Sequence, residues 1–145
     1  MADVSNVARY FLSLAEDEAG DDVSNLKLQK LLYYAQGFHL ALFDRPLFEN
    51  EIRAWTHGPV VAEVYRDYKQ HGGNPIPRAQ CDLDALTNAE QELLAEVYQV
   101  YGQYSAWKLR NMTHEEAPWV TAYGQAPDSV ISHGAMRDFF RTLVH

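Results

Sequence analysis

LQKLLYYAQ, residues 28–36, is the stretch of sequence that decides the fold. Its leucines recur at helical spacing, while Tyr33 and Tyr34 make the remaining faces apolar as well. Ser24 is a good N-cap, and the pattern predicts a helix from there to about Asp44. A helix that is apolar on almost every side is typical of the centre of a fold. We therefore expect the other elements to pack around this helix.

Apolar residues at helical spacing and capping signals predict further helices on both sides of the central one. The predicted segments are residues 3–17, a helix that enters at Gly58-Pro59, Thr87–Tyr101, Ser105–Met112, Pro118–Tyr123 and a last helix after the cap Ser132. Alternating residues before Trp55 favour a short strand. The predicted architecture is mostly α: a compact single-domain helical bundle, residues 1–145, of about six or seven helices with a short extended segment near Ile52–Trp55.

Composition and charge restrict the possible partners and the compartment. The formal net charge is -8, from 12 Lys and Arg against 20 Asp and Glu, so we do not expect non-specific nucleic-acid binding. Cys81 is the single cysteine, which excludes an internal disulfide and favours the cytoplasm. The N-terminus lacks the pattern of a signal peptide, and the apolar stretch 31–43 is too short to span a bilayer. We expect a cytoplasmic protein without a membrane span.

Motifs that carry catalysis or bind metals are incomplete. His114 begins like the zinc-protease motif, but Pro118 stands where the second His is required. Ser105 and Lys108 have the Ser-x-x-Lys spacing of serine penicillin-recognising enzymes, yet the companion motifs are missing and a helix cap explains Ser105. We therefore predict no catalytic residue, no metal and no cofactor, and we do not expect an enzyme.

Aromatic residues are abundant for a chain of this size. Nine Tyr, six Phe and three Trp exceed what one core requires. Tyr and Trp anchor protein interfaces because they combine a large contact area with a polar tip. Trp55 is expected to be largely buried, since an exposed indole is costly unless a partner covers it. These features favour a function in binding another protein.

The stretch 28–36 and several later motifs resemble the Panacea family of SocA-like antitoxins and GepA-like phage-associated proteins. The later motifs are Pro46-Leu47-Phe48, Ala54-Trp55, His57-Gly58-Pro59-Val60, Thr113-His114 and Pro118-Trp119. The resemblance implies a helical protein of phages or mobile elements that neutralises a cognate protein toxin by direct contact. It also implies, for SocA-type members, delivery of the toxin to a ClpXP-type protease. We take Lys30, Tyr34, Trp55 and His57 as the candidate partner-binding residues.

Two alternatives of other classes remain open at this point. A small hydrolase or metal-dependent enzyme would use His57 with a carboxylate that folding brings near, in a pocket with perturbed titratable groups. A phage structural or regulatory protein with a nucleic-acid partner would need a basic strip on the surface.

Overall fold

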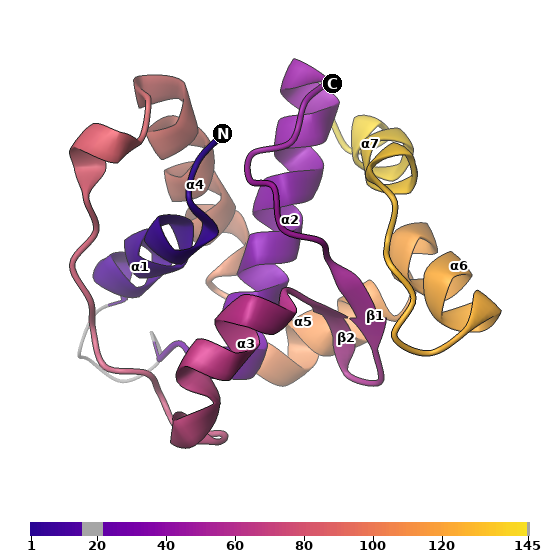
Figure 1. The fold of residues 1–145 in the computed structure, drawn as a ribbon, viewed down its shortest axis with the longest axis horizontal. Helices are drawn as coiled ribbons and strands as arrows, with labels where there is room; N and C mark the ends of the chain where they lie inside the picture. Colours follow the sequence, from indigo (N-terminus) through magenta and orange to yellow (C-terminus); the bar gives the residue numbers. More distant parts are fainter. Residues whose placement is uncertain (16–21, 145) are drawn as a thin grey trace.

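Helix α2 (Asn25–Phe43) runs through the middle of the molecule in the computed structural model, which describes residues 1–15 and 22–144 (Figure 1). Helices α1 (Val4–Leu14) and α4 (Asn88–Tyr101) lie on one side of it, and α6 (Ala117–Gln125) and α7 (His133–Arg141) on the other. The remaining elements are α3 (Ala62–Tyr68), α5 (Ala106–Thr113), the strands β1 (Arg53–Trp55) and β2 (Gly58–Val60), and the 3₁₀ turns Lys69–His71 and Leu83–Ala85. The described residues thus form seven α-helices and one small hairpin, which confirms the predicted mostly α architecture.

Side-chain caps fix the start of most helices where the sequence predicted them. The capping oxygens belong to Asp3, Ser24, Thr87, Ser105 and Ser132. Thr87 and Glu90 form the predicted capping box. Helix α2 ends at Asp44, which adopts the left-handed conformation with φ 57°. Helix α1 ends at Leu14, earlier than predicted, and the connection predicted to follow it falls largely outside the described residues.

The β-hairpin corrects one helix boundary. Gly58–Val60 pairs antiparallel with Arg53–Trp55, which confirms the extended segment, and α3 begins only at Ala62. The predicted helix entry at Pro59 is therefore wrong. Gly58 has φ 108°, a conformation that suits the hairpin turn and that residues with a side chain rarely adopt. Strand pairing with Arg53–Trp55 overrides the preference of proline for a first helical turn.

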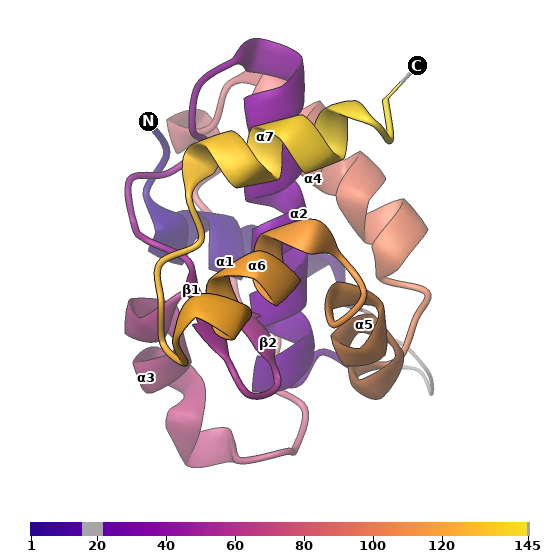
Figure 2. The same ribbon diagram turned by 90° about the vertical axis from the view of Figure 1, so that its right-hand side faces the viewer.

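Helix α7 crosses α2 at a close contact (Figure 2). The ring of Phe140 lies over Gly37, where a Cβ atom would overlap it. The rings of Tyr33, Tyr34 and Phe38 surround Phe140 with centroid distances of 5.3, 5.9 and 4.8 Å. Glycine at position 37 therefore allows the aromatic residues of the two helices to pack into one cluster.

Buried polar side chains of α2 bind the backbone of the segments around it. Gln36 is fully buried; its Oε1 accepts hydrogen bonds from the amides of Leu47 (2.7 Å) and Phe48, and its Nε2 donates to the carbonyl of Phe48. Gln29 accepts from the amide of Val61 at 2.9 Å. Lys27 donates to the carbonyl of Gly102 at 2.6 Å. One helix thus satisfies backbone groups of three loops.

No helix among the described residues is long and apolar enough to cross a membrane.

The Gln36 contacts predict a large stability cost for Gln36→Ala. The substitution would leave two buried amides and one buried carbonyl unpaired, and each unpaired group costs about 1–3 kcal/mol. We expect the free energy of unfolding in urea, followed by circular dichroism, to fall by about 2–4 kcal/mol. The control Gln70→Ala removes an exposed glutamine and should change it by less than about 0.5 kcal/mol. Equal stability of the two variants would contradict the role given to Gln36.

Candidate functional site

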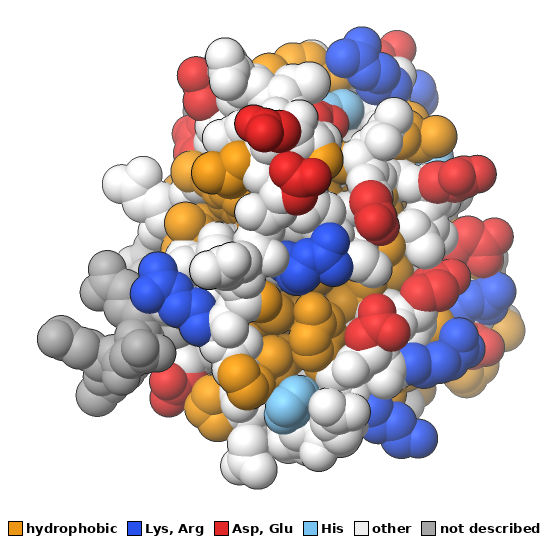
Figure 3. Space-filling view, turned by 60° about the vertical axis from the view of Figure 1, so that its left-hand side comes forward, with side chains coloured by type: hydrophobic (Ala, Val, Ile, Leu, Met, Phe, Trp, Pro, Cys, Tyr) orange, Lys and Arg blue, Asp and Glu red, His pale blue; other side chains and the backbone are white. Residues whose placement is uncertain are grey.

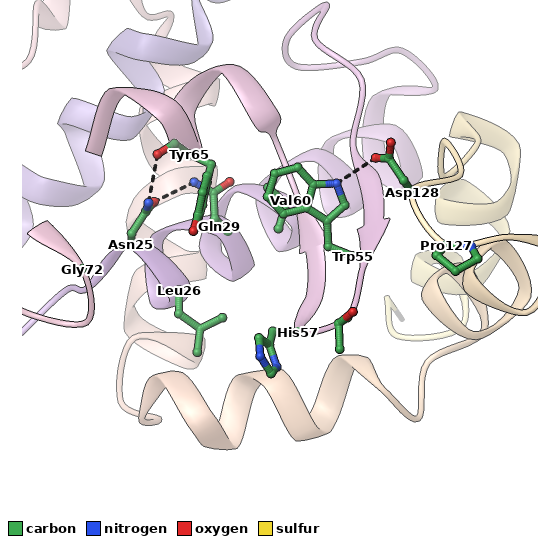
Figure 4. Close-up of a pocket in the computed structure, with 11 residues that line it drawn as sticks. Asn25, Leu26, Gln29, Trp55, His57, Val60, Tyr65, Gly72, Pro127 and Asp128 are labelled. Carbon is green, nitrogen blue, oxygen red and sulfur yellow. Dashed lines mark hydrogen bonds between the residues drawn. The ribbon is translucent and has the colours of Figure 1, made fainter. Parts of the chain in front are cut away.

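A hollow of about 550 Å³ lies beside the hairpin (Figure 4). Its walls come from the start of α2, the hairpin, α3 and the loop after α6, and its lining includes Leu26, Trp55, His57, Tyr65 and Asp128. Its volume falls within the usual range of ligand sites, about 300–1,000 Å³. The hollow therefore has room for a side chain of a partner.

Trp55 forms one wall of the hollow. Its indole N–H donates to Oδ1 of Asp128 at 2.8 Å, and its ring meets the edge of Tyr65 with centroids 5.1 Å apart. From the other side, the indole N–H of Trp119 donates to the carbonyl of Trp55 at 2.8 Å. Trp55 has intermediate burial, which agrees with the expectation that most of its side chain is covered. It is held in place while one side stays open to the hollow.

His57, in the hairpin turn, is exposed and lies next to α5. Its ring is 5.9 Å from that of Trp107, and its Nδ1 accepts a hydrogen bond from Nε of Arg110 at 3.4 Å. The guanidinium of Arg110 lies 4.5 Å from the centre of the Trp107 ring, and Trp107 is 54% exposed. We call these three residues, His57, Trp107 and Arg110, the α5 face. His57 belongs to the α5 face and also lines the hollow, as Figure 4 shows.

Lys30 does not lie at the surface, which corrects its interpretation as a surface contact. It is fully buried, and its Nζ donates to the carbonyl of Pro59 at 3.1 Å. A Cβ atom at Gly58 would lie 2.6 Å from Cε of Lys30 and 2.8 Å from Oγ1 of Thr113. Burial, and then the charge of Arg110, lower the pKa of Lys30 to about 7. Lys30 holds the hairpin against α2 from inside.

Tyr34 is fully buried as well, so the side chain that was a candidate for partner contact is an internal one. Its hydroxyl donates to Oε2 of Glu116 at 3.0 Å, and the hydroxyl of Tyr33 donates to Oε1 at 2.9 Å. The ring of Tyr34 stacks on that of Tyr101 at 3.9 Å. Both tyrosines of the central stretch thus tie α2 to Glu116, the residue that precedes α6.

Sequence reasoning missed Glu116, Trp107 and Arg110. Glu116 lies more than 80 residues from its tyrosine partners, so no local pattern indicates the contact. Trp107 and Arg110 are three residues apart in the predicted fifth helix, a spacing that places both on one helix face. That spacing was a usable signal for a shared surface.

The enzyme alternative required a carboxylate near His57 and titratable groups with shifted pKa values. Asp128 does line the same hollow, and the pKa of Lys30 is lowered, but Asp128 is hydrogen-bonded to Trp55. Within residues 1–15 and 22–144, no three His, Cys, Asp or Glu side chains are grouped to hold a metal ion. His57 is hydrogen-bonded to Arg110, and none of its hydrogen bonds in the described part of the chain involves a carboxylate.

On the face in Figure 3, acidic side chains are spread widely and the basic ones form no continuous strip, so this face does not favour nucleic acid.

Glu116 should make stability depend on pH. Burial raises the pKa of Glu116 to about 7, although the two tyrosine hydroxyls lower it in part. The folded chain then holds this proton more tightly than the unfolded chain, whose carboxyl has a pKa near 4.5. The contribution of Glu116 to the free energy of unfolding should therefore fall as the pH rises from about 4.5 to 7. Glu116→Gln should remove this fall. The free energy of unfolding of the variant, relative to that of wild type, should therefore rise by about 1–3 kcal/mol from pH 5 to pH 7.5.

Urea unfolding at these two pH values measures the effect, and Glu115→Gln, which changes the exposed neighbouring carboxyl, is the control. A difference between Glu116→Gln and wild type that is the same at both pH values would contradict the titration of Glu116 in this range.

Comparison with known proteins identifies the family. The model of the "Antitoxin SocA-like, Panacea domain" family matches residues 28–120. "Antitoxin SocA" of Caulobacter vibrioides (strain NA1000 / CB15N) is 33% identical over 127 residues, which cover 77% of this chain and 68% of that protein. No solved structure matches the chain. The matched region includes most of α2, the hairpin, α5 and Glu116, and the chain belongs to the SocA-like Panacea domain family of antitoxins.

Proposed function

We propose that this chain is an antitoxin that neutralises a cognate protein toxin, encoded beside it, by direct and stable binding. Its similarity over most of its length to a protein named as an antitoxin is the observation that carries the proposal. Neutralisation is then stoichiometric and needs no chemical turnover. The surface that binds the toxin is the α5 face together with the hollow, where Trp55 and His57 contribute.

Three properties of this surface support the choice. Trp107 is the most exposed aromatic side chain among those that the structure describes. Its indole is held by Arg110, so little side-chain entropy is lost when a partner covers it. The hollow beside it, with Trp55 and Tyr65 in its walls, provides a pocket of the kind that anchors interface residues.

Charge and aromatic contacts have separate effects in this proposal. The net charge of -8 accelerates the approach of a basic toxin at low ionic strength. Burial of Trp107 and the walls of the hollow determines how slowly the complex dissociates. The association rate should therefore depend strongly on salt, and the dissociation rate much less.

Truncation of the exposed indole tests the proposed surface. We expect Trp107→Ala to weaken the complex with the product of the adjacent gene by about 10- to 100-fold, because a central interface Trp contributes about 1.4–3 kcal/mol. Co-expression, pull-down and a growth assay measure the effect, with His57→Ala as a second variant. Leu83→Ala, which truncates a side chain that is 50% exposed and lies outside the α5 face, should bind like wild type.

The same strains separate binding alone from delivery to a protease. With translation blocked, the toxin level should stay constant if binding suffices, and should fall only in the presence of the antitoxin if a ClpXP-type protease takes part. Rescue of growth by sub-stoichiometric antitoxin, with neither a complex nor toxin degradation, would contradict the binding mechanism.

A further inference from the structure

The α5 face carries the cation Arg110 beside the exposed ring of Trp107, on a chain that is acidic overall. Helix α5 contains Lys108 and Arg110 and no Asp or Glu. Beneath the face, the charge of Arg110 lowers the pKa of both Lys30 and His114, after burial as the larger cause. The charged side chains of α5 are thus all basic, although the chain carries a net charge of -8.

Arg110 has no carboxylate partner in the part of the chain that the structure describes. There, ion pairs are made by Arg53, Arg137 and Arg141. Arg110 instead donates to His57 and to Oδ1 of Asn111. Of the nearby acids, Glu115 is exposed and Glu116 is bonded to two tyrosines. An arginine that is held over a Trp ring and has no ion pair can bind an anion with its remaining N–H groups.

His57 adds a second donor, and its side chain is exposed. Because its Nδ1 accepts from Arg110, the neutral imidazole carries its proton on Nε2. Nε2–H and the free N–H groups of Arg110 can bind one carboxylate, with the exposed indole of Trp107 beside it. The chemistry that fits these donors is therefore an Asp or Glu side chain.

The hollow continues from His57 and is mainly apolar at its walls. Trp55, Tyr65, Val60 and Leu26 contribute carbon surface, and the volume of about 550 Å³ exceeds what one aromatic side chain fills. Asp128 is already engaged by Trp55 and lies 3.6 Å from Arg53, so it is a poor site for a second cation. The hollow thus favours an apolar or aromatic side chain over a basic one.

We infer that the hollow and the α5 face together bind an acidic, aromatic peptide segment of the partner protein. An aromatic or large apolar side chain enters the hollow, and a carboxylate within one or two residues of it pairs with Arg110 and His57. This inference names the chemistry of the partner segment and rests on the proposed function for the statement that the partner is the toxin.

Selection from a random 12-residue peptide library displayed on phage tests the inference without the toxin. The full chain is the immobilised target. The enriched peptides should carry Asp or Glu within two residues of an aromatic or large apolar residue. A synthetic peptide of the consensus should bind Arg110→Glu at least tenfold more weakly than wild type, and Trp107→Ala also more weakly.

Arg45→Glu is the matched control, because Arg45 is an exposed arginine that lies over another ring, that of Phe43, at 5.9 Å. It should bind the consensus peptide like wild type, and circular dichroism should show that each variant is folded. Enrichment of basic peptides, no enrichment, or equal binding by folded Arg110→Glu and wild type would overturn the inference. Such a result leaves the co-expression test intact, since a toxin can be neutralised through another surface.

Discussion

Hydrogen bonds from buried side chains of α2 to the backbone of later segments hold the rest of the structure in place. Gln36 binds the segment that leads to the hairpin, Lys30 binds strand β2, and Gln29 binds the entry to α3. Two strands of three residues are too short to be stable alone. The hairpin is held from two sides. Lys30 of the central helix binds the carbonyl of Pro59, and the amide and carbonyl of Ala54 bind the segment at Asp128 and Ser129. Each of these groups would cost about 1–3 kcal/mol if it were buried without a partner.

This arrangement explains why the family motif of the central helix lies inside the protein while the candidate binding surface lies above it. Lys30 contacts Pro59 and lies against Gly58, directly after the turn that carries His57. Glu116, bound by Tyr33 and Tyr34, fixes the junction between α5 and α6. Both sides of the α5 face are thus anchored to α2. A surface organised before binding loses less entropy when a partner arrives, which favours tight complexes.

Local signals predicted the helices well because caps and spacing act over a few residues. Ser24, Thr87, Ser105 and Ser132 each accept the hydrogen bond that their position in the sequence suggested. The site was less predictable, since the direction of a side chain depends on segments that return from far along the chain. Lys30 and Tyr34 lie in the buried middle of α2, so their motif marks the fold. Trp55 and His57 belong to the hairpin and do lie beside the hollow.

The net charge of the chain and the cation Arg110 in the α5 face favour opposite charges on a partner. Net charge acts on an approaching molecule over about 8–10 Å, the Debye length near physiological ionic strength, and it favours a basic partner. Arg110 and His57 act only in contact and, by our inference, favour a carboxylate. A protein that is merely basic approaches quickly but leaves Arg110 without a partner at the interface. The cost of this unpaired charge shortens the lifetime of the complex. A protein that is merely acidic is repelled before it arrives. The combination selects a partner that is basic overall and presents an acidic, aromatic segment, so specificity arises from two opposite charge requirements on one molecule.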